Sequence, residues 1–118
     1  MYKLVILIDT TVAPEQLEQL WPEFLHQSEL MPGLRRETTS RVDTHLLGAI
    51  PYQIMHELIF DTPEQARQAM ASEAGRNAGR LLQTMTGGRV TLFLADHKED
   101  DLENIRKYRQ AKSSPPTS

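Results

Sequence analysis

The sequence predicts an α+β fold of the ferredoxin-like βαββαβ type, in which helices cover one face of a four-stranded antiparallel sheet. Two observations support this prediction. Segments with strand and helix periodicity follow one another as strand, helix, two strands, helix and strand, and they fill residues 2–96 almost completely. This order also leaves one face of the sheet without helices, and we expect that face to be buried against a ligand, a partner or a second copy of the chain.

A central strand and a first helix are marked most clearly. Residues 2–9 (YKLVILID) are rich in β-branched side chains and nearly apolar on both faces, which is typical of a strand in the middle of a sheet. Pro14 suits a first helical turn, and apolar residues at spacings of three and four predict a helix over residues 14–27. Pro22 lies inside this helix, so we expect a kink or a break near residues 18–22.

The next two strands differ in polarity. Residues 34–44 (LRRETTSRVDT) alternate in a mostly polar way, which predicts an edge strand. Residues 52–61 (YQIMHELIFD) are mostly apolar on both faces, and each face carries one ionisable side chain, His56 on one and Glu57 on the other. We expect His56 to face the helices and Glu57 to face away from them.

The second helical region is expected in two parts. Thr62 predicts an N-cap followed by Pro63 in the first turn, and Ser72 predicts a restart of the helix. Gly87 and Gly88 then turn the chain into a fourth strand over residues 89–96.

Length, charge and cysteine content limit the classes of protein. The 118 residues suffice for one core, so we expect one domain over residues 1–96 and a polar C-terminal tail over residues 97–118, partly disordered, with a short helix possible over residues 100–111. The net charge of -3 lacks the basic excess of a nucleic-acid binder, and the apolar N-terminal stretch is too short to span a membrane. The absence of cysteine fits the cytoplasmic location that we expect.

Four stretches of sequence then point to a family. They are MPGLRR at residues 31–36, PY followed by HELIFD within residues 51–61, ASEAGR at residues 71–76 and GRVTLF at residues 88–93. In this order they resemble the EthD family, named for ethyl tert-butyl ether degradation. The resemblance implies the dimeric α/β barrel superfamily, whose sheets pack face to face across a two-fold axis. A homodimer of this kind would cover the sheet face that the helices leave open.

Glu57 and two histidines are the catalytic candidates. If the strand face of Glu57 lines the barrel, its carboxylate points into an apolar cavity, where desolvation suits a general acid or base. The structural alternative is an ion pair of Glu57 with Arg35 or Arg41. For His56 the alternative is a hydrogen-bonded core histidine. Family members usually carry a histidine in the first helix, and His26 is the candidate for that position.

A ligand would need polar and apolar contacts. Tyr52 or Arg41 would orient a polar ligand atom. The apolar lining is expected from Val5, Leu7, Met55, Ile59 and Phe93.

Metal and cofactor sites are not indicated by the sequence. His45, beside Asp43, fits either a cavity mouth or a solvated loop. The four histidines show no short paired spacing, and no phosphate-binding or dinucleotide-binding loop is present, so we expect neither a metal nor a bound cofactor.

Two classes of function therefore stay open. The first is a small enzyme that holds an apolar or aromatic molecule in the barrel and acts as a cofactor-independent oxidoreductase, cyclase or isomerase, as the resemblance implies. The second is a non-catalytic dimer that binds a small molecule or supports a partner oxygenase in the degradation of organic compounds. A haem-binding barrel is a third and weaker alternative.

Overall fold

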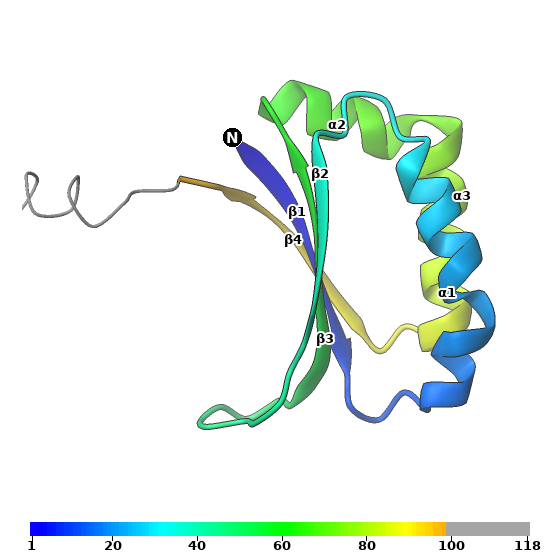
Figure 1. Cartoon of the computed structure of the whole chain (residues 1–118), viewed down its shortest axis with the longest axis vertical. Coiled ribbons are helices and arrows are strands. Elements are labelled where there is room, and N and C mark those ends of the chain that lie inside the picture. Colours follow the sequence, from blue (N-terminus) through cyan, green and yellow to red (C-terminus); the bar gives the residue numbers. More distant parts are fainter. Residues whose placement is uncertain (99–118) are drawn as a thin grey trace, which may run out of the picture.

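Four antiparallel strands form one sheet in the order β2-β3-β1-β4, and the three helices lie on one side of it (Figure 1). The computed structural model describes residues 1–98, so the predictions for residues 100–111 and for the end of the tail lie outside the described residues. The predicted ferredoxin-like α+β fold is confirmed. Its elements are β1 (Tyr2–Asp9), α1 (Pro14–Glu29), β2 (Arg36–Arg41), β3 (Tyr52–Phe60), α2 (Pro63–Ala71), α3 (Glu73–Thr86) and β4 (Val90–Asp96).

The first helix is longer than predicted and is not broken. It runs as one helix from Pro14 to Glu29 with Pro22 inside it. Pro22 has no N–H to donate to the carbonyl of Glu18, but both residues lie on the exposed side of α1. The helix continues through Pro22 because water can hydrate this carbonyl, and the predicted break is therefore wrong.

The second helical region divides at Ser72, as predicted. The side chain of Thr62 caps α2, since its Oγ1 accepts a hydrogen bond from the N–H of Gln65 at 3.1 Å. Ser72 ends α2 and caps α3, because its Oγ accepts from the N–H of Gly75 at 3.0 Å. A Cβ added to Gly75 would fall far inside contact distance of the Ala69 carbonyl oxygen, so the sharp junction between α2 and α3 depends on glycine at this position.

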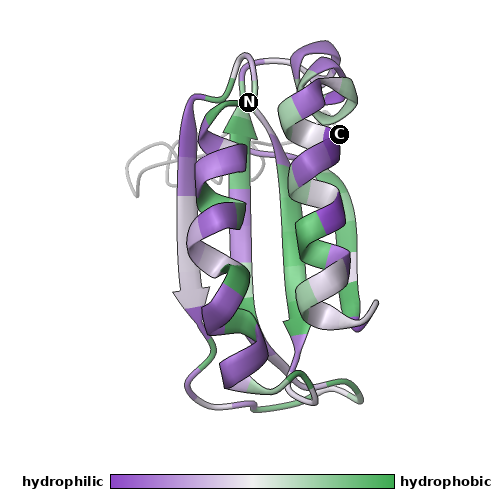
Figure 2. Ribbon diagram, turned by 90° about the vertical axis from the view of Figure 1, so that its right-hand side faces the viewer, coloured by the Kyte–Doolittle hydropathy of each residue, from purple (hydrophilic) through white to green (hydrophobic). Residues whose placement is uncertain are grey.

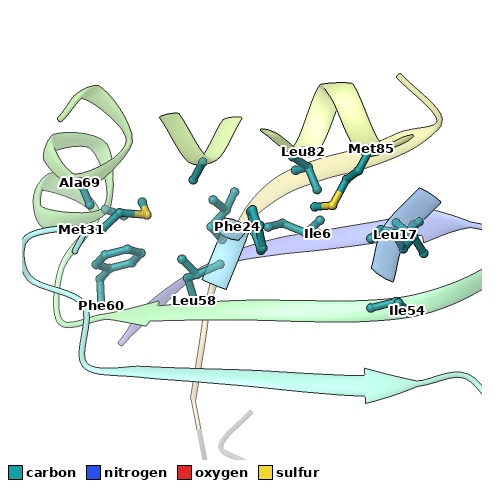
Figure 3. Close-up of a cluster of buried hydrophobic side chains, with 14 of the residues drawn as sticks. Ile6, Leu17, Phe24, Met31, Ile54, Leu58, Phe60, Ala69, Leu82 and Met85 are labelled. Atoms are coloured by element: carbon teal, nitrogen blue, oxygen red, sulfur yellow. The ribbon is translucent and has the colours of Figure 1, made fainter. Parts of the chain in front are cut away.

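The hydrophobic core lies between the helices and one sheet face. Ile6 of β1 and Leu58 of β3 are 2% and 1% exposed, and they meet Phe24 of α1 and Leu82 of α3 (Figure 3). Alternate residues of every strand therefore face the helices, and their neighbours face away. The edge strand β2 is hydrophilic, in contrast to the hydrophobic central strands (Figure 2).

The edge strand β2 is shorter than predicted. Residues 42–51 leave the sheet as a loop between β2 and β3, which bends to the side opposite the helices (Figure 1). We call these residues the β2–β3 loop. Leu46 and Leu47 at its tip are 90% and 94% exposed. Among the described residues, no helix is both long enough and apolar enough to cross a membrane.

Candidate functional site

We call the sheet face that no helix covers the open face. The strand register defines it, because the side chains of Leu4, Ile6 and Ile8 face the core and their neighbours face the other way. The open-face side chains are Lys3, Val5, Leu7, Arg36, Thr38, Ser40, Tyr52, Met55, Glu57, Ile59, Thr91, Phe93 and Ala95.

The apolar residues expected to line a cavity all lie on the open face. They come from three neighbouring strands, with Val5 and Leu7 on β1, Met55 and Ile59 on β3, and Phe93 on β4. Phe93 is 45% exposed in the single chain. An exposed aromatic ring beside a cluster of apolar side chains is typical of a surface that binds a partner or a ligand.

Glu57 lies on the same face, but its ion-pair partner was predicted wrongly. Its Oε2 is 2.5 Å from Nζ of Lys3, and the two side chains are 13% and 20% exposed. The register explains this contact, because Lys3 and Glu57 lie diagonally on the adjacent strands β1 and β3. Arg35 instead pairs with Asp61, at 3.6 Å. Arg41 pairs in register with a core-facing residue of β3, so it belongs to the other side of the sheet.

Tyr52 reaches across the open face at one end of the sheet. Its hydroxyl is 3.4 Å from Oγ1 of Thr91 on β4, although β1 lies between the two strands. A phenol hydroxyl at the border of an apolar surface can donate a hydrogen bond to a carbonyl or a phenolate of a ligand. Tyr52 therefore stays a candidate for orienting a ligand, whereas Arg41, on the opposite side, does not.

His56 faces the helices, as predicted, and is completely buried. Its Nδ1 lies 2.8 Å from Oγ1 of Thr39, and its Nε2 lies 2.6 Å from Oε2 of Glu37. The rings of Trp21 and Phe24 contact the imidazole edge-on, with centroids 5.2 and 5.5 Å away. Both ring nitrogens of His56 thus have partners within the chain, which is the pattern of a core histidine.

Glu37 connects His56 to the first helix. The hydroxyl of Ser28, a buried residue near the end of α1, lies 2.6 Å from Oε2 of Glu37. Burial raises the pKa of this carboxyl, but the hydrogen bonds from His56 and Ser28 and the electrostatic interaction with His56 outweigh it, so the pKa of Glu37 is lowered. This cluster could not be predicted from the sequence, because Glu37 and Thr39 belong to a strand whose pattern is that of a solvated edge.

Two other histidines lie at the surface. His26 is exposed on α1, and His45 is exposed in the β2–β3 loop. Within residues 1–98, no group of three histidine, aspartate or glutamate side chains is placed to hold a metal ion.

The structure does not bring Glu57 and a histidine to one site. His56 and Glu57 are neighbours on β3 and therefore face opposite sides of the sheet. The open face alone combines an apolar lining, a carboxylate, an ammonium group and a phenol. Fold and site together define a ferredoxin-like α+β protein with a sheet face that no helix covers, on which apolar side chains surround an ion pair between Lys3 and Glu57.

Comparison with known proteins supports this fold class. The sequence matches no family model and no curated protein. Among solved structures, the chain is similar to an ethyl tert-butyl ether degradation (EthD) family protein from Bacillus halodurans C-125, with a TM-score of 0.74 and 22% identity over 83% of this chain and 99% of that chain. The resemblance to the EthD family is thus confirmed at the level of the fold.

Two further structures show the range of proteins that share this fold. A dimeric ferredoxin-like protein of unknown function from Thermobifida fusca has a TM-score of 0.62 and 17% identity, over 81% of this chain and 90% of that chain. SnoaB, a cofactor-independent oxygenase from Streptomyces nogalater, has a TM-score of 0.64 and 14% identity, over 84% of this chain and 94% of that chain. Identities this low establish a common fold and leave the function to be argued from the site.

Proposed function

We propose that the chain is an EthD-like homodimer whose two open faces enclose a site for an apolar or aromatic small molecule. One observation carries this proposal. The open face joins apolar side chains from three strands around the ion pair of Lys3 and Glu57, and Phe93 on the edge strand β4 is left 45% exposed. Pockets for small molecules are usually apolar with a few polar groups that fix orientation.

A second copy is the occupant that best explains the open face. The β2–β3 loop bends to the same side as this face and exposes Leu46 and Leu47 almost fully (Figure 1). A dimer that buries both the loop and Phe93 removes this apolar area from water, which favours association. The Thermobifida fusca protein of the same fold is itself dimeric.

The chemistry that we propose is proton abstraction without a bound cofactor. The carboxylate of Glu57 accepts a proton from an acidic C–H or O–H group of the ligand, and the ammonium group of Lys3 stabilises the anion that forms. An enolate or phenolate anion is the first intermediate of cyclisation, isomerisation and cofactor-independent oxygenation alike. The oxygenase SnoaB shows that this fold supports chemistry of the last kind in another protein.

A non-catalytic binding protein is the second candidate, and the ion pair favours it. Lys3 lies 2.5 Å from Glu57 and compensates its charge. Such an ion pair also allows both charged groups to be buried in a dimer interface. In this case the dimer would hold a small molecule or assist a partner oxygenase, and Glu57 would have no part in turnover.

Native mass spectrometry of freshly purified protein tests assembly and ligand together. We expect a dimer that retains a small apolar molecule, and a monomer at micromolar concentration would contradict the proposal. The retained molecule then becomes the substrate for a comparison of Glu57→Gln with Glu64→Gln, a matched change on the exposed surface of α2. Loss of turnover in Glu57→Gln alone supports the enzyme, and unchanged turnover supports the binding protein.

A further inference from the structure

We propose that Lys3 is a nucleophile that forms an imine with an aldehyde or ketone group of an apolar or aromatic ligand. This role of Lys3 rests on the proposed function, and it names the chemical class of molecule that the open face takes. The observation behind it is the ion pair of Lys3 and Glu57, in which Nζ and Oε2 are 2.5 Å apart. A lysine amine beside a proton acceptor, in apolar surroundings, is the arrangement that suits covalent catalysis on carbonyl compounds.

The strand register places the amine of Lys3 among apolar side chains. Lys3 lies opposite Ile59 of β3, whereas Glu57 lies opposite Val5, two residues further along β1. The contact with Glu57 therefore directs the side chain of Lys3 along the sheet toward Val5, and not off the end of the strand. A ligand on the apolar part of the open face would meet this amine.

The neighbouring residues on β4 leave room for such a ligand. Lys3 lies opposite Ala95, whose side chain is a single methyl group, and diagonal to Phe93, which is 45% exposed. Diagonal neighbours on adjacent strands have Cβ atoms about 7 Å apart, within the reach of a lysine side chain. An aromatic ring that stacks on Phe93 can therefore bring a carbonyl group to the amine.

Glu57 can supply the neutral amine that this reaction needs. The side chains of Lys3 and Glu57 are 20% and 13% exposed in the single chain, and two apposed open faces would exclude the remaining water. Both charges then lose their hydration, and transfer of one proton from the ammonium group to the carboxylate removes both charges together. Assembly of the dimer thus favours the neutral pair, in which the amine of Lys3 can attack.

The transferred proton is used later in the same reaction. The amine adds to the carbonyl carbon, a C–N bond forms, and one amine proton passes to the oxygen to give a carbinolamine. The carboxyl group of Glu57 then gives its proton to this hydroxyl, which leaves as water while the nitrogen lone pair forms the C=N bond. The product is a protonated imine beside the carboxylate of Glu57. No oxidant or reductant is needed, and the charges of the original ion pair are restored.

Lys98 provides a comparison within the same chain. It also has a carboxylate partner, since its Nζ lies 4.0 Å from Oδ2 of Asp96. These two side chains are 81% and 64% exposed, so their charges stay hydrated. If apolar surroundings activate the amine, Lys3 should react and Lys98 should not.

Reductive trapping with 2-naphthaldehyde and sodium cyanoborohydride tests this role on the full chain. The reductant converts the imine to a stable secondary amine, and tandem mass spectrometry separates a label on Lys3 from one on Lys98 or on the N-terminal amine. We expect most of the label on Lys3. Lys3→Arg keeps a cation beside Glu57 and should lose this label, whereas Lys98→Arg should leave it unchanged. Glu57→Gln should slow labelling of Lys3 by about 100-fold, because the group that accepts and returns the proton is lost.

Several results would overturn the proposal. These are equal labelling of Lys3 and Lys98, a total label that is unchanged in Lys3→Arg, and labelling of Lys3 that is not slowed in Glu57→Gln. The native mass spectrum of the same sample separates this proposal from the proposed function. A dimer without label on Lys3 would overturn the imine and leave the enclosed site in place. A monomer would contradict both, because the amine would then stay in water.

Discussion

Nε2 of His56 lies 2.6 Å from Oε2 of Glu37, and this contact joins the buried strand β3 to the edge strand β2 through their side chains. Ser28 extends the connection to α1. A strand that reads as solvated edge is thus attached to the core by a carboxylate. Together these hydrogen bonds connect β2, β3 and α1 at an edge of the sheet. Without them, β2 would be held by backbone pairing alone.

Glu37→Gln should lower the free energy of unfolding by about 1–3 kcal/mol at pH 7, because a charged acceptor of two hydrogen bonds is lost. The folded pKa of Glu37 is lowered, so its contribution is complete above the ordinary glutamate pKa of about 4.3 and is lost as the pH falls through the folded value. Urea unfolding of both chains at pH 7 and pH 3 checks this. A difference that stays the same at both pH values would contradict the assignment, and Glu64→Gln is the exposed control.

Two glycines of α3 should respond in opposite ways to the same substitution. Gly75→Ala should destabilise the chain, since the new methyl group meets the carbonyl oxygens of Ala69 and Met70. Gly79→Ala should stabilise it by about 0.5–1 kcal/mol, because it faces open space and alanine favours helix. Thermal unfolding of the two variants measures the contrast, and equal shifts would show that the junction of α2 and α3 adjusts.

The β2–β3 loop should contribute to the dimer. Replacing Leu46 and Leu47 together by serine should shift the association equilibrium toward monomer without lowering the stability of the fold, since neither side chain packs in the core. Light scattering across a micromolar concentration series measures this. Leu30→Ser is the control, because Leu30 is 58% exposed but lies at the end of α1 on the helix side. A dimer that weakens equally in the control would indicate a different interface.

Apart from the residues of the Lys3–Glu57 and Glu37–His56 contacts, Gln53 should be the polar residue whose loss lowers the free energy of unfolding most. Its side-chain amide donates to the backbone carbonyls of Asp9 and Val12, at 2.9 and 2.8 Å, beside an irregularity in the pairing of β1 and β3. Gln53→Ala leaves both carbonyls without this donor and should cost about 1–3 kcal/mol. Denaturant unfolding against Gln68→Ala, an exposed change on α2, provides the comparison.

Hydrophobic periodicity was enough to predict the fold, because each element combines a clear pattern with a cap or a turn. Ser72 illustrates this, since it was predicted and observed at the break between two helices. The open face was also accessible, because strand alternation separates Val5 and Leu7 from the core once β1 is identified as central.

The partners of the ionisable groups were not accessible from the sequence. Lys3 and Glu57 are 54 positions apart, and their contact depends on which strands are neighbours and on their register. The different surroundings of Gly75 and Gly79 were not accessible either, because a glycine within a helical pattern looks the same whether it faces packed atoms or open space.

The adjacent residues His56 and Glu57 also determine how β3 is aligned with its neighbours. Most of YQIMHELIF is apolar on both faces, so burial alone distinguishes poorly between the observed pairing and one shifted by a single residue. Such a shift would turn the imidazole toward the open face and the carboxylate toward the rings of Trp21 and Phe24. His56 would then lose its contact with Glu37, and Glu57 would lose its contact with Lys3. The hydrogen bond of His56 and the ion pair of Glu57, on opposite faces of one strand, thus select a single alignment, which the hydrophobic side chains then stabilise.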